Sequence, residues 1–444
     1  MDGSQPGLYL SQCFGEIGGY EEGNDADTLS ACQFDGTGQY LATGDKGGRI
    51  VIFKKAEEAI YEPYAEFQSH ESDFDYLKSL EIEERINQIQ FLPPTNNAVF
   101  LLSTNDKTVK LWKVGERRVG LSGEKSEGSL FPPKAQDSRT IVATPRRTYA
   151  NAHNYHINSI SMNSDGETFV SADDLRINLW SHEIEEECFN IVDIKPPSME
   201  DLTEVITSCQ FHPSHCHMMI HSSSKGSIKL GDLRARALVD TQSKVLQQSV
   251  EVGSDKSFFS EIIASISDAR FSPDGRYIVS RDYMTLKLWD VNMESSPVLT
   301  IPLQQHLTSK FVQLYENDCI FDKFECCVSG DGMFVGSGSY DGVFKVFNAS
   351  TGKMESEVRM GTEHMERSQT ATDFNFSEKV LHLSWSPTTD TLAVCGSNRL
   401  YIYNGIRDGK GGTFLPMQEE RWDGDEDKEE DTSTVAEHVN NIKL

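Results

Sequence analysis

Short apolar segments recur along this chain in a fixed order. Each unit has an apolar strand, a turn rich in Gly, Pro, Asp or Asn, a second strand, a polar turn, and a third strand that usually ends at an aromatic residue. Such short alternating runs, bounded by turn residues, are typical of half-buried β-strands. The unit occurs seven times, at residues 31–53, 86–112, 157–180, 206–234, 266–290, 324–348 and 380–404. The pattern therefore predicts an all-β protein built from one repeated unit.

Seven such units favour a seven-bladed β-propeller, because one unit cannot bury its apolar faces alone and the units must stack radially. Equivalent apolar positions are about 58 residues apart on average, more than the roughly 40–45 of a plain WD40 blade. The predicted fold is thus a seven-bladed WD40-type β-propeller with long inter-blade insertions. We expect the propeller at 29–404, after an N-terminal segment at 1–28 whose run 7–14 closes the ring as an outer strand. We expect 405–444 to be an acidic, disordered tail.

The charge balance narrows the class of partner. The chain has 41 basic and 69 acidic residues, for a formal net charge of −28, and residues 416–444 contain ten acidic and three basic ones. The rest of the chain is therefore strongly acidic as well. Such a field repels nucleic acid and anionic membranes and attracts basic partners. The alternative is that the acidity only keeps the protein soluble.

The cysteines and the apolar runs bear on the compartment. The nine cysteines form no C-x-x-C pair, and most lie in apolar strand-like runs, as Cys32 and Cys209 do. They are typical of reduced core residues, which indicates a cytoplasmic protein, with the nucleus as a second compartment. We expect no secretory signal, because the N-terminus is polar and acidic after Leu10, and no membrane helix, since no apolar run approaches ~20 residues. The sequon at Asn348 is then expected to stay unmodified.

The connection before the second unit holds far more than a turn needs. Its acidic residues are Glu71, Asp73, Asp75, Glu81, Glu83 and Glu84. We expect either an amphipathic helix, with Phe74, Leu77 and Leu80 on one face, or an extended loop. In both cases the apolar side is expected to pack down and the carboxylates to face out. So much specific material at a connection indicates a binding surface; the alternative is a solvated charged face.

The turns between the second and third strands carry polar residues at equivalent places. Asp and Asn in such turns hydrogen-bond to the local backbone, so each of them has a structural explanation. Equivalent turns of a propeller nevertheless converge on one face. We therefore expect a ring of side chains around the central channel, formed by Lys46, Asp106, Asp173, Asp174 and Tyr340.

No nucleophile, base and orienting group form a recognisable catalytic set. His153, Tyr155 and His156 precede a strand of the third unit, where a histidine typically hydrogen-bonds within its own blade; catalysis is the alternative. The histidine-rich segment 212–221 suggests a metal site, but strand alternation splits its ligands between two faces. We therefore expect no enzymatic activity, no metal and no cofactor.

The insertion at 113–150 is basic in an otherwise acidic chain. It carries eight basic and four acidic residues, and Gly, Pro and Ser are frequent in it. One interpretation is a loose loop. The other is an arm that leaves the ring and binds an acidic partner.

Two stretches resemble signatures of the B-type (55 kDa) regulatory subunits of protein phosphatase 2A. They are Asp73-Phe-Asp-Tyr-Leu-Lys-Ser-Leu-Glu-Ile-Glu-Glu-Arg-Ile-Asn87 and Asn151-Ala-His-Asn-Tyr-His-Ile-Asn-Ser-Ile-Ser-Met-Asn-Ser-Asp165. Supporting runs lie at 41–48, 101–107, 171–180, 190–196, 257–263 and 314–327. The resemblance extends from about residue 29 to residue 404.

This resemblance implies a non-catalytic subunit that joins a HEAT-repeat scaffold (A) subunit and a dimetal Ser/Thr phosphatase catalytic (C) subunit. It implies that an arm within 113–150 grips the scaffold and that an acidic propeller face recruits basic phosphoproteins. The candidates for scaffold binding are Arg117, Arg118, Lys134, Arg146 and Arg147. The candidates for substrate binding are Lys46, Asp75, Glu81, Glu83, Glu84, Asp173, Asp193 and Tyr340.

Two other functions stay open on the sequence. One is a general WD40 adaptor, for example a substrate receptor of a ubiquitin ligase. Affinity isolation of this chain that recovers neither the scaffold nor the catalytic phosphatase subunit would favour this function. The other is an enzyme in its own right, which a purified chain that dephosphorylates a substrate without a partner would support.

Overall fold

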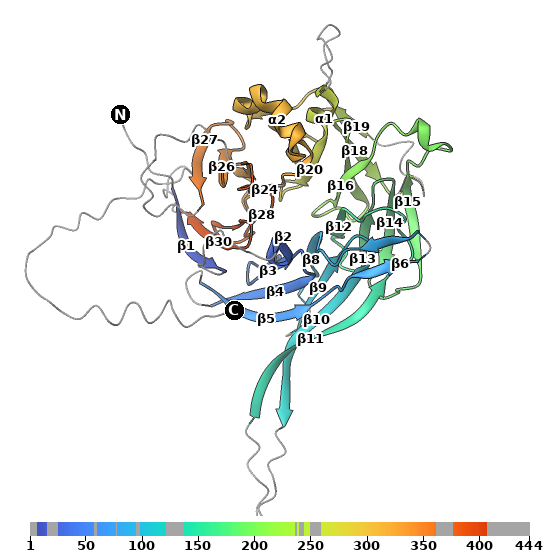
Figure 1. Cartoon of the computed structure of the whole chain (residues 1–444), viewed down its shortest axis with the longest axis vertical. Helices are drawn as coiled ribbons and strands as arrows, with labels where there is room; N and C mark the ends of the chain where they lie inside the picture. The colour runs from blue at the N-terminus through green and yellow to red at the C-terminus, as the bar shows by residue number, and fades with distance from the viewer. Residues whose placement is uncertain are drawn as a thin grey trace, which may run out of the picture.

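Seven four-stranded antiparallel sheets form a closed ring in the computed structural model of this chain (Figure 1). The structure describes residues 7–15, 25–56, 60–76, 78–94, 98–120, 137–235, 238, 244–248, 259–360 and 376–405. The ring is a seven-bladed β-propeller, which confirms the fold class predicted from the repeats.

Each blade runs from an inner strand beside the central channel to an outer strand at the rim. The inner strands are β2 (Leu29–Phe34), β8 (Gln88–Phe91), β12 (Ser159–Met162), β16 (Ile206–Phe211), β20 (Ile266–Phe271), β24 (Cys326–Val328) and β28 (Leu383–Trp385). The second strands are β3 (Tyr40–Asp45), β9 (Val99–Thr104), β13 (Thr168–Ala172), β17 (Met218–Ser223), β21 (Tyr277–Asp282), β25 (Phe334–Gly338) and β29 (Thr391–Cys395). The third strands are β4 (Arg49–Lys55), β10 (Val109–Gly120), β14 (Arg176–Ser181), β18 (Ser227–Asp232), β22 (Thr285–Asp290), β26 (Val343–Asn348) and β30 (Leu400–Gly405). The outer strands of blades 1 to 6 are β5 (Tyr61–Gln68), β11 (Asp137–Tyr149), β15 (Cys188–Asp193), β19 (Lys244–Gln247), β23 (Leu299–Pro302) and β27 (Met354–Arg359).

The outer strand of blade 7 comes from the other end of the chain. β1 (Leu8–Phe14) pairs antiparallel with β30, from Leu8 opposite Gly405 to Phe14 opposite Leu400. This is the pairing expected for the run 7–14. The side chain of Gln12 then joins blade 7 to blade 1, because it accepts from the Tyr61 backbone N–H (2.7 Å) and donates to the Tyr61 carbonyl (2.9 Å). The pairing covers the edge of β30, which would otherwise be open to another chain.

The apolar core lies between neighbouring blades. Between blades 1 and 2, Ile50 and Ile52 of β4 pack against Leu101 and Trp112, all almost completely buried. The seams are close: a Cβ at Gly338 of blade 6 would lie 2.0 Å from the carbonyl oxygen of Val380 in blade 7. The ring is therefore held together by packing between sheets that are apolar on both faces.

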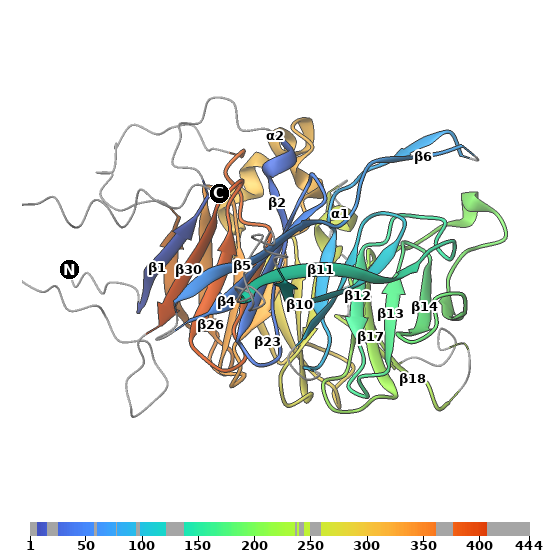
Figure 2. The ribbon, with the colours of Figure 1, turned by 90° about the horizontal axis from the view of Figure 1, so that it is seen from below.

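Several connections form additional elements. They are η1 (Asp25–Asp27), β6 (Asp73–Asp75), β7 (Leu80–Ile82), η2 (Met199–Asp201), α1 (Ser260–Ala264), η3 (Gln305–Lys310), α2 (Phe311–Glu316) and η4 (Cys319–Phe321). β6 and α2 project from the same side of the ring, which we call the insertion face (Figure 2). No helix in the described segments is long and apolar enough to span a membrane.

The third and outer strands of blade 2 are much longer than their counterparts. β10 has 12 residues and β11 has 13, and they stay paired from Val109 opposite Tyr149 to Gly120 opposite Asp137. Figure 1 shows the pair leaving the ring as a long hairpin. The described part of the 113–150 insertion is therefore a β-arm, while its binding to an acidic partner stays a prediction.

Candidate partner-binding surfaces

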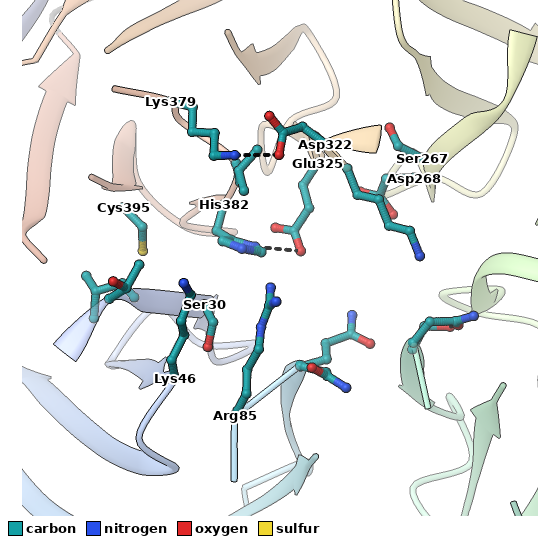
Figure 3. A pocket seen from close by; sticks show the side chains of 18 of the residues that line it. Ser30, Lys46, Arg85, Ser267, Asp268, Asp322, Glu325, Lys379, His382 and Cys395 are labelled. Carbon is teal, nitrogen blue, oxygen red and sulfur yellow. Dashed lines mark hydrogen bonds and ion pairs between the residues drawn. The ribbon is translucent and has the colours of Figure 1, made fainter. Parts of the chain in front are cut away.

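A cavity of about 750 Å³ occupies the mouth of the central channel, and residues from all seven blades line it (Figure 3). The repeat explains this, because every blade places the start of its inner strand and a neighbouring turn at the same radius. Lys46, Asp106 and Asp174 all line the cavity, as expected for turns that converge on one face. Asp173 and Tyr340, the other two residues expected there, do not line it.

Most charged side chains at the cavity wall form ion pairs across the blade connections. Lys46 Nζ lies 2.7 Å from Asp25 Oδ1, and Lys379 Nζ lies 2.5 Å from Asp322 Oδ1. In the same cavity, His382 Nδ1 lies 3.2 Å from Glu325 Oε1. Burial raises the pKa of Glu325, but His382 and Arg270 outweigh burial and hold that pKa below its ordinary value.

Two cations at the cavity differ from the others. Arg85 points into the cavity in Figure 3, and its buried Nε has no hydrogen-bond partner in the described part of the chain. Lys323 forms no ion pair with any residue that the structure describes. Burial raises the pKa of Asp174, and the positive charge of Lys323 partly offsets this effect. The cavity wall is therefore a mixture of neutralised pairs and single charges of both signs.

The acidic connection before blade 2 is a β-hairpin, not a helix. β6 and β7 pair from Asp73 opposite Ile82 to Asp75 opposite Leu80. The expectation that the apolar side packs down is wrong for Phe74 and Leu80, whose exposed fractions are 44% and 59%. The hairpin extends beyond the ring on the insertion face, so no core lies beneath it (Figure 2). Leu77 lies outside the described residues.

Two lysines link this hairpin to the loop that precedes blade 3: Lys78 in the β6–β7 turn and Lys107 in the β9–β10 turn. Lys78 Nζ donates to the carbonyl of Asn154 (2.5 Å), and Lys107 Nζ donates to the carbonyl of His153 (3.0 Å). Lys107 Nζ also lies 3.7 Å from Asp75 Oδ2. Burial and the charge of Lys78 lower the pKa of Lys107 despite Asp75. The two signature stretches of the sequence are thus in contact.

Most candidates for the acidic face are accessible. Glu81 and Glu83 are exposed and Glu84 is half-buried. The candidates that already have a charged partner are Asp75 with Lys107 (3.7 Å), Lys46 with Asp25 (2.7 Å) and Asp193 with Arg176 (3.0 Å).

Asp173 and Tyr340 are corrections to the predicted surface, because their exposed fractions are 0% and 1%. The hydroxyl of Tyr340 bonds to the Cys319 carbonyl (2.6 Å), to Asp322 Oδ2 (2.9 Å) and to the hydroxyl of Tyr283 (2.9 Å). Burial is the main reason that the pKa of Tyr340 is raised. Tyr340 therefore fixes η4 to blade 6 and does not face a partner.

The histidines that suggested chemistry have structural partners. Nδ1 of His153 lies 2.9 Å from Asp173 within blade 3, which confirms the predicted blade-internal bond. In the 212–221 segment, Nδ1 of His212 accepts from the backbone N–H of His215 (3.0 Å). No group of His, Cys, Asp and Glu among the described residues is arranged to hold a metal ion.

The β-arm carries basic side chains away from the ring. Arg117 and Arg146 are exposed, whereas Arg147 is half-buried and lies 3.3 Å from Glu183 of blade 3. Arg118 lies on β10 opposite Arg139 of β11. Lys134 lies outside the described residues.

Sequence reasoning missed several residues of the insertion face. Arg85, Asp322, Lys323 and His382 lie outside the aligned turns, in connections whose lengths differ between blades, so no repeat position marked them. One feature of the sequence could have identified these residues. They lie just before the inner strands β8, β24 and β28, where the chain reaches the channel.

Known proteins share this architecture and much of the sequence. Two segments match the family model "WD domain, G-beta repeat": residues 143–181, from the end of β11 in blade 2 to β14 in blade 3, and residues 259–290 in blade 5. The beta isoform of the 55 kDa regulatory B subunit of serine/threonine protein phosphatase 2A from Arabidopsis thaliana is 46% identical over 89% of this chain and 96% of its own length. The regulatory B subunit of protein phosphatase PP2A from Schizosaccharomyces pombe is 48% identical over 89% of this chain and 97% of its own length. The alpha isoform of the 55 kDa regulatory B subunit from Oryza sativa subsp. japonica is 46% identical over 90% of this chain and 85% of its own length.

Proposed function

Because this chain belongs to the family of 55 kDa regulatory B subunits of protein phosphatase 2A, we propose that it links the scaffold (A) and catalytic (C) subunits and recruits basic phosphoproteins to them. The chain is a non-catalytic regulator that acts within the phosphatase complex. Its part is to position substrates, while bond cleavage belongs to the catalytic subunit. This division agrees with a channel mouth whose carboxylates are largely neutralised by neighbouring cations.

The observation that carries the recruitment proposal is the set of carboxylates on the β6–β7 hairpin. Asp73, Glu81 and Glu83 are exposed, and none of them forms an ion pair with any described residue. They project on the insertion face of a chain with a net charge of −28. Unpaired carboxylates on a projecting element raise the local concentration of basic segments.

The β-arm is the proposed contact to the scaffold. It projects from blade 2 and carries the exposed Arg117 and Arg146, basic residues in a chain with a net charge of −28. A long antiparallel hairpin can extend basic groups to a partner while the blades keep their own packing. The remaining candidates are Arg147, which pairs with Glu183 of blade 3, Arg118 of β10, and Lys134, which lies outside the described residues.

The proposed mechanism is tethering. A substrate held on a rigid ring beside the active site meets that site at the effective concentration of an intramolecular reaction, often in the millimolar range. Binding on the insertion face then changes which phosphoproteins are dephosphorylated without changing the chemistry. We propose the cytoplasm as the main compartment, with the nucleus as a second one, since the buried cysteines in the described part of the chain are free thiols.

The direct test is size-exclusion chromatography of the purified chain with the phosphatase scaffold–catalytic core at moderate salt. We expect one complex with the three subunits in equal amounts. Separate elution would contradict the assembly proposal and leave a propeller adaptor with another client. Phosphatase activity of the isolated chain on a phosphopeptide would contradict the non-catalytic role.

A further inference from the structure

Two aromatic side chains stand in solvent on the β6–β7 hairpin. The exposed fraction is 84% for Tyr76 and 44% for Phe74. Their ring centroids are 5.1 Å apart and the rings are nearly perpendicular, at 75°. This edge-to-face contact orders the two rings relative to each other. The two aromatic side chains are therefore exposed on the hairpin and do not contribute to the packing of the propeller.

The hairpin register places a carboxylate beside this aromatic pair. Glu81 of β7 lies directly opposite Phe74 of β6, so their side chains share one face of the hairpin at a Cβ separation of about 4.5–5.5 Å. Asp75 lies on the other face, where it contacts Lys107. Glu81 has no ion pair with any described residue. One face of the hairpin thus combines two rings with an unneutralised carboxylate.

The composition of this face selects among possible occupants. An apolar partner surface would bury the carboxylate of Glu81 without a countercharge, which is strongly unfavourable. A purely acidic face would explain Glu81 but not the exposed Phe74 and Tyr76. A cation that also binds aromatic faces satisfies both groups of side chains.

We propose that Phe74, Tyr76 and Glu81 form a binding site for the guanidinium group of an arginine in an extended basic segment. This inference rests on the proposed recruitment of basic phosphoproteins and names the side chain that the hairpin selects. A planar guanidinium stacks on an aromatic ring and at the same time donates two hydrogen bonds to one carboxylate. A lysine ammonium lacks the plane and the fork, so it gains less at the same site.

The rest of the hairpin keeps this site in place and extends it. Lys78 and Lys107 tie the hairpin to the carbonyls of Asn154 and His153, which limits how far the rings can move relative to blade 3. Glu83 lies two residues after Glu81 and is also exposed. A second basic residue of the bound segment then meets Glu83 through charge alone.

The test measures the binding of two labelled peptides to the full-length chain by fluorescence anisotropy at low salt. The peptides share a Gly/Ser backbone and differ only in carrying arginines or lysines at the same positions. The variant Phe74→Leu/Tyr76→Leu removes the rings and keeps apolar side chains. The control Phe189→Leu removes another exposed phenylalanine, 67% exposed on β15, which lies opposite Leu179 and not a carboxylate.

We expect the wild-type chain to bind the arginine peptide about 3- to 10-fold tighter than the lysine peptide. The double leucine variant should lose this preference, while Phe189→Leu should keep it. Glu81→Gln, which preserves shape and carries no folding risk from ring removal, should also weaken the arginine peptide more than the lysine peptide.

The failures are distinguishable. Equal affinities of the wild-type chain for the two peptides, or a preference that survives in the double leucine variant, would overturn the arginine site and leave basic recruitment intact. Absence of binding of either peptide at low salt would overturn the recruitment proposal together with the arginine site. Co-elution of each variant with the scaffold–catalytic core serves as the check that the propeller is intact.

Discussion

Nδ1 of His153 lies 2.9 Å from the carboxylate of Asp173 inside blade 3, where the exposed fractions of the two side chains are 2% and 0%. Nε2 of the same ring lies 2.6 Å from the hydroxyl of Ser171, which accepts from the indole N–H of Trp180 (2.9 Å). This chain of hydrogen bonds joins the loop before β12 to the β13–β14 turn and to β14. A residue that the sequence placed on a binding face is therefore part of the blade interior.

Replacing Asp173 should destabilise the propeller. Asp173→Ala leaves His153 and the backbone N–H groups of Leu175 and Arg176 without their acceptor, at a cost of roughly 2–4 kcal/mol. The measurement is the denaturant midpoint and the melting temperature. The neighbouring Asp174 lines the cavity and provides the matched control. Equal destabilisation by Asp174→Ala would contradict this role of Asp173.

Acid should destabilise the fold through two buried histidines. Burial, the largest cause, lowers the pKa of His221 to about 4 and that of His70 to about 3. The unfolded chain takes up a proton on each near pH 6.5, whereas the folded chain stays neutral there. Stability is thus complete above about pH 6.5 and falls toward pH 4, by at most about 1.4 kcal/mol per pH unit for each histidine.

Stability measured between pH 7.5 and 5 in the variants His221→Gln and His70→Gln checks this expectation. Each substitution should flatten the decline by its own share, and the double variant should flatten it most, even if the variants are less stable at pH 7.5. A slope identical to that of the wild-type chain in the double variant would show that other groups cause the acid sensitivity.

Charge reversal on the hairpin should separate recruitment from assembly. Glu81→Lys/Glu83→Lys/Glu84→Lys is expected to weaken the binding of basic peptides by roughly tenfold or more at low salt. The substitution replaces unpaired carboxylates, which attract these peptides, with ammonium groups that repel them. Assembly with the scaffold and catalytic subunits should persist. The control is Glu185→Lys/Glu186→Lys/Glu187→Lys, with the same charge change on exposed residues of the β14–β15 connection, at the opposite end of β14 from Asp174. Equal loss of assembly and peptide binding in the hairpin variant would indicate a structural role.

The arm variant Arg117→Glu/Arg146→Glu should weaken assembly and spare peptide binding. Both residues are exposed on the β-arm, so the blades should fold normally. The expected loss is roughly tenfold in the affinity for the scaffold subunit, with a stronger effect at low salt, measured by surface plasmon resonance. Arg276→Glu/Lys353→Glu, exposed residues of blades 5 and 6, is the matched control. An unchanged affinity in the arm variant would exclude the arm as the charged contact.

The sequence alone determined the seven-bladed ring, because alternating strands and turn residues recur at fixed places and a unit that cannot bury its own faces must stack. It also predicted the strand 7–14, which pairs with β30. The turn residues Lys46, Asp106 and Asp174 reach the channel as expected, since equivalent turns of a propeller converge.

Only the tertiary structure decided which polar residues are available to a partner. Asp173 and Asp174 are adjacent and chemically identical, yet one bonds to His153 in the blade interior and the other lines the cavity. Likewise, Phe74 has the apolar spacing of a packed residue and is exposed, because its hairpin extends past the edge of the ring. A local pattern gives the direction of a side chain relative to its own strand, whereas burial depends on the neighbouring blade that the closed ring brings against it.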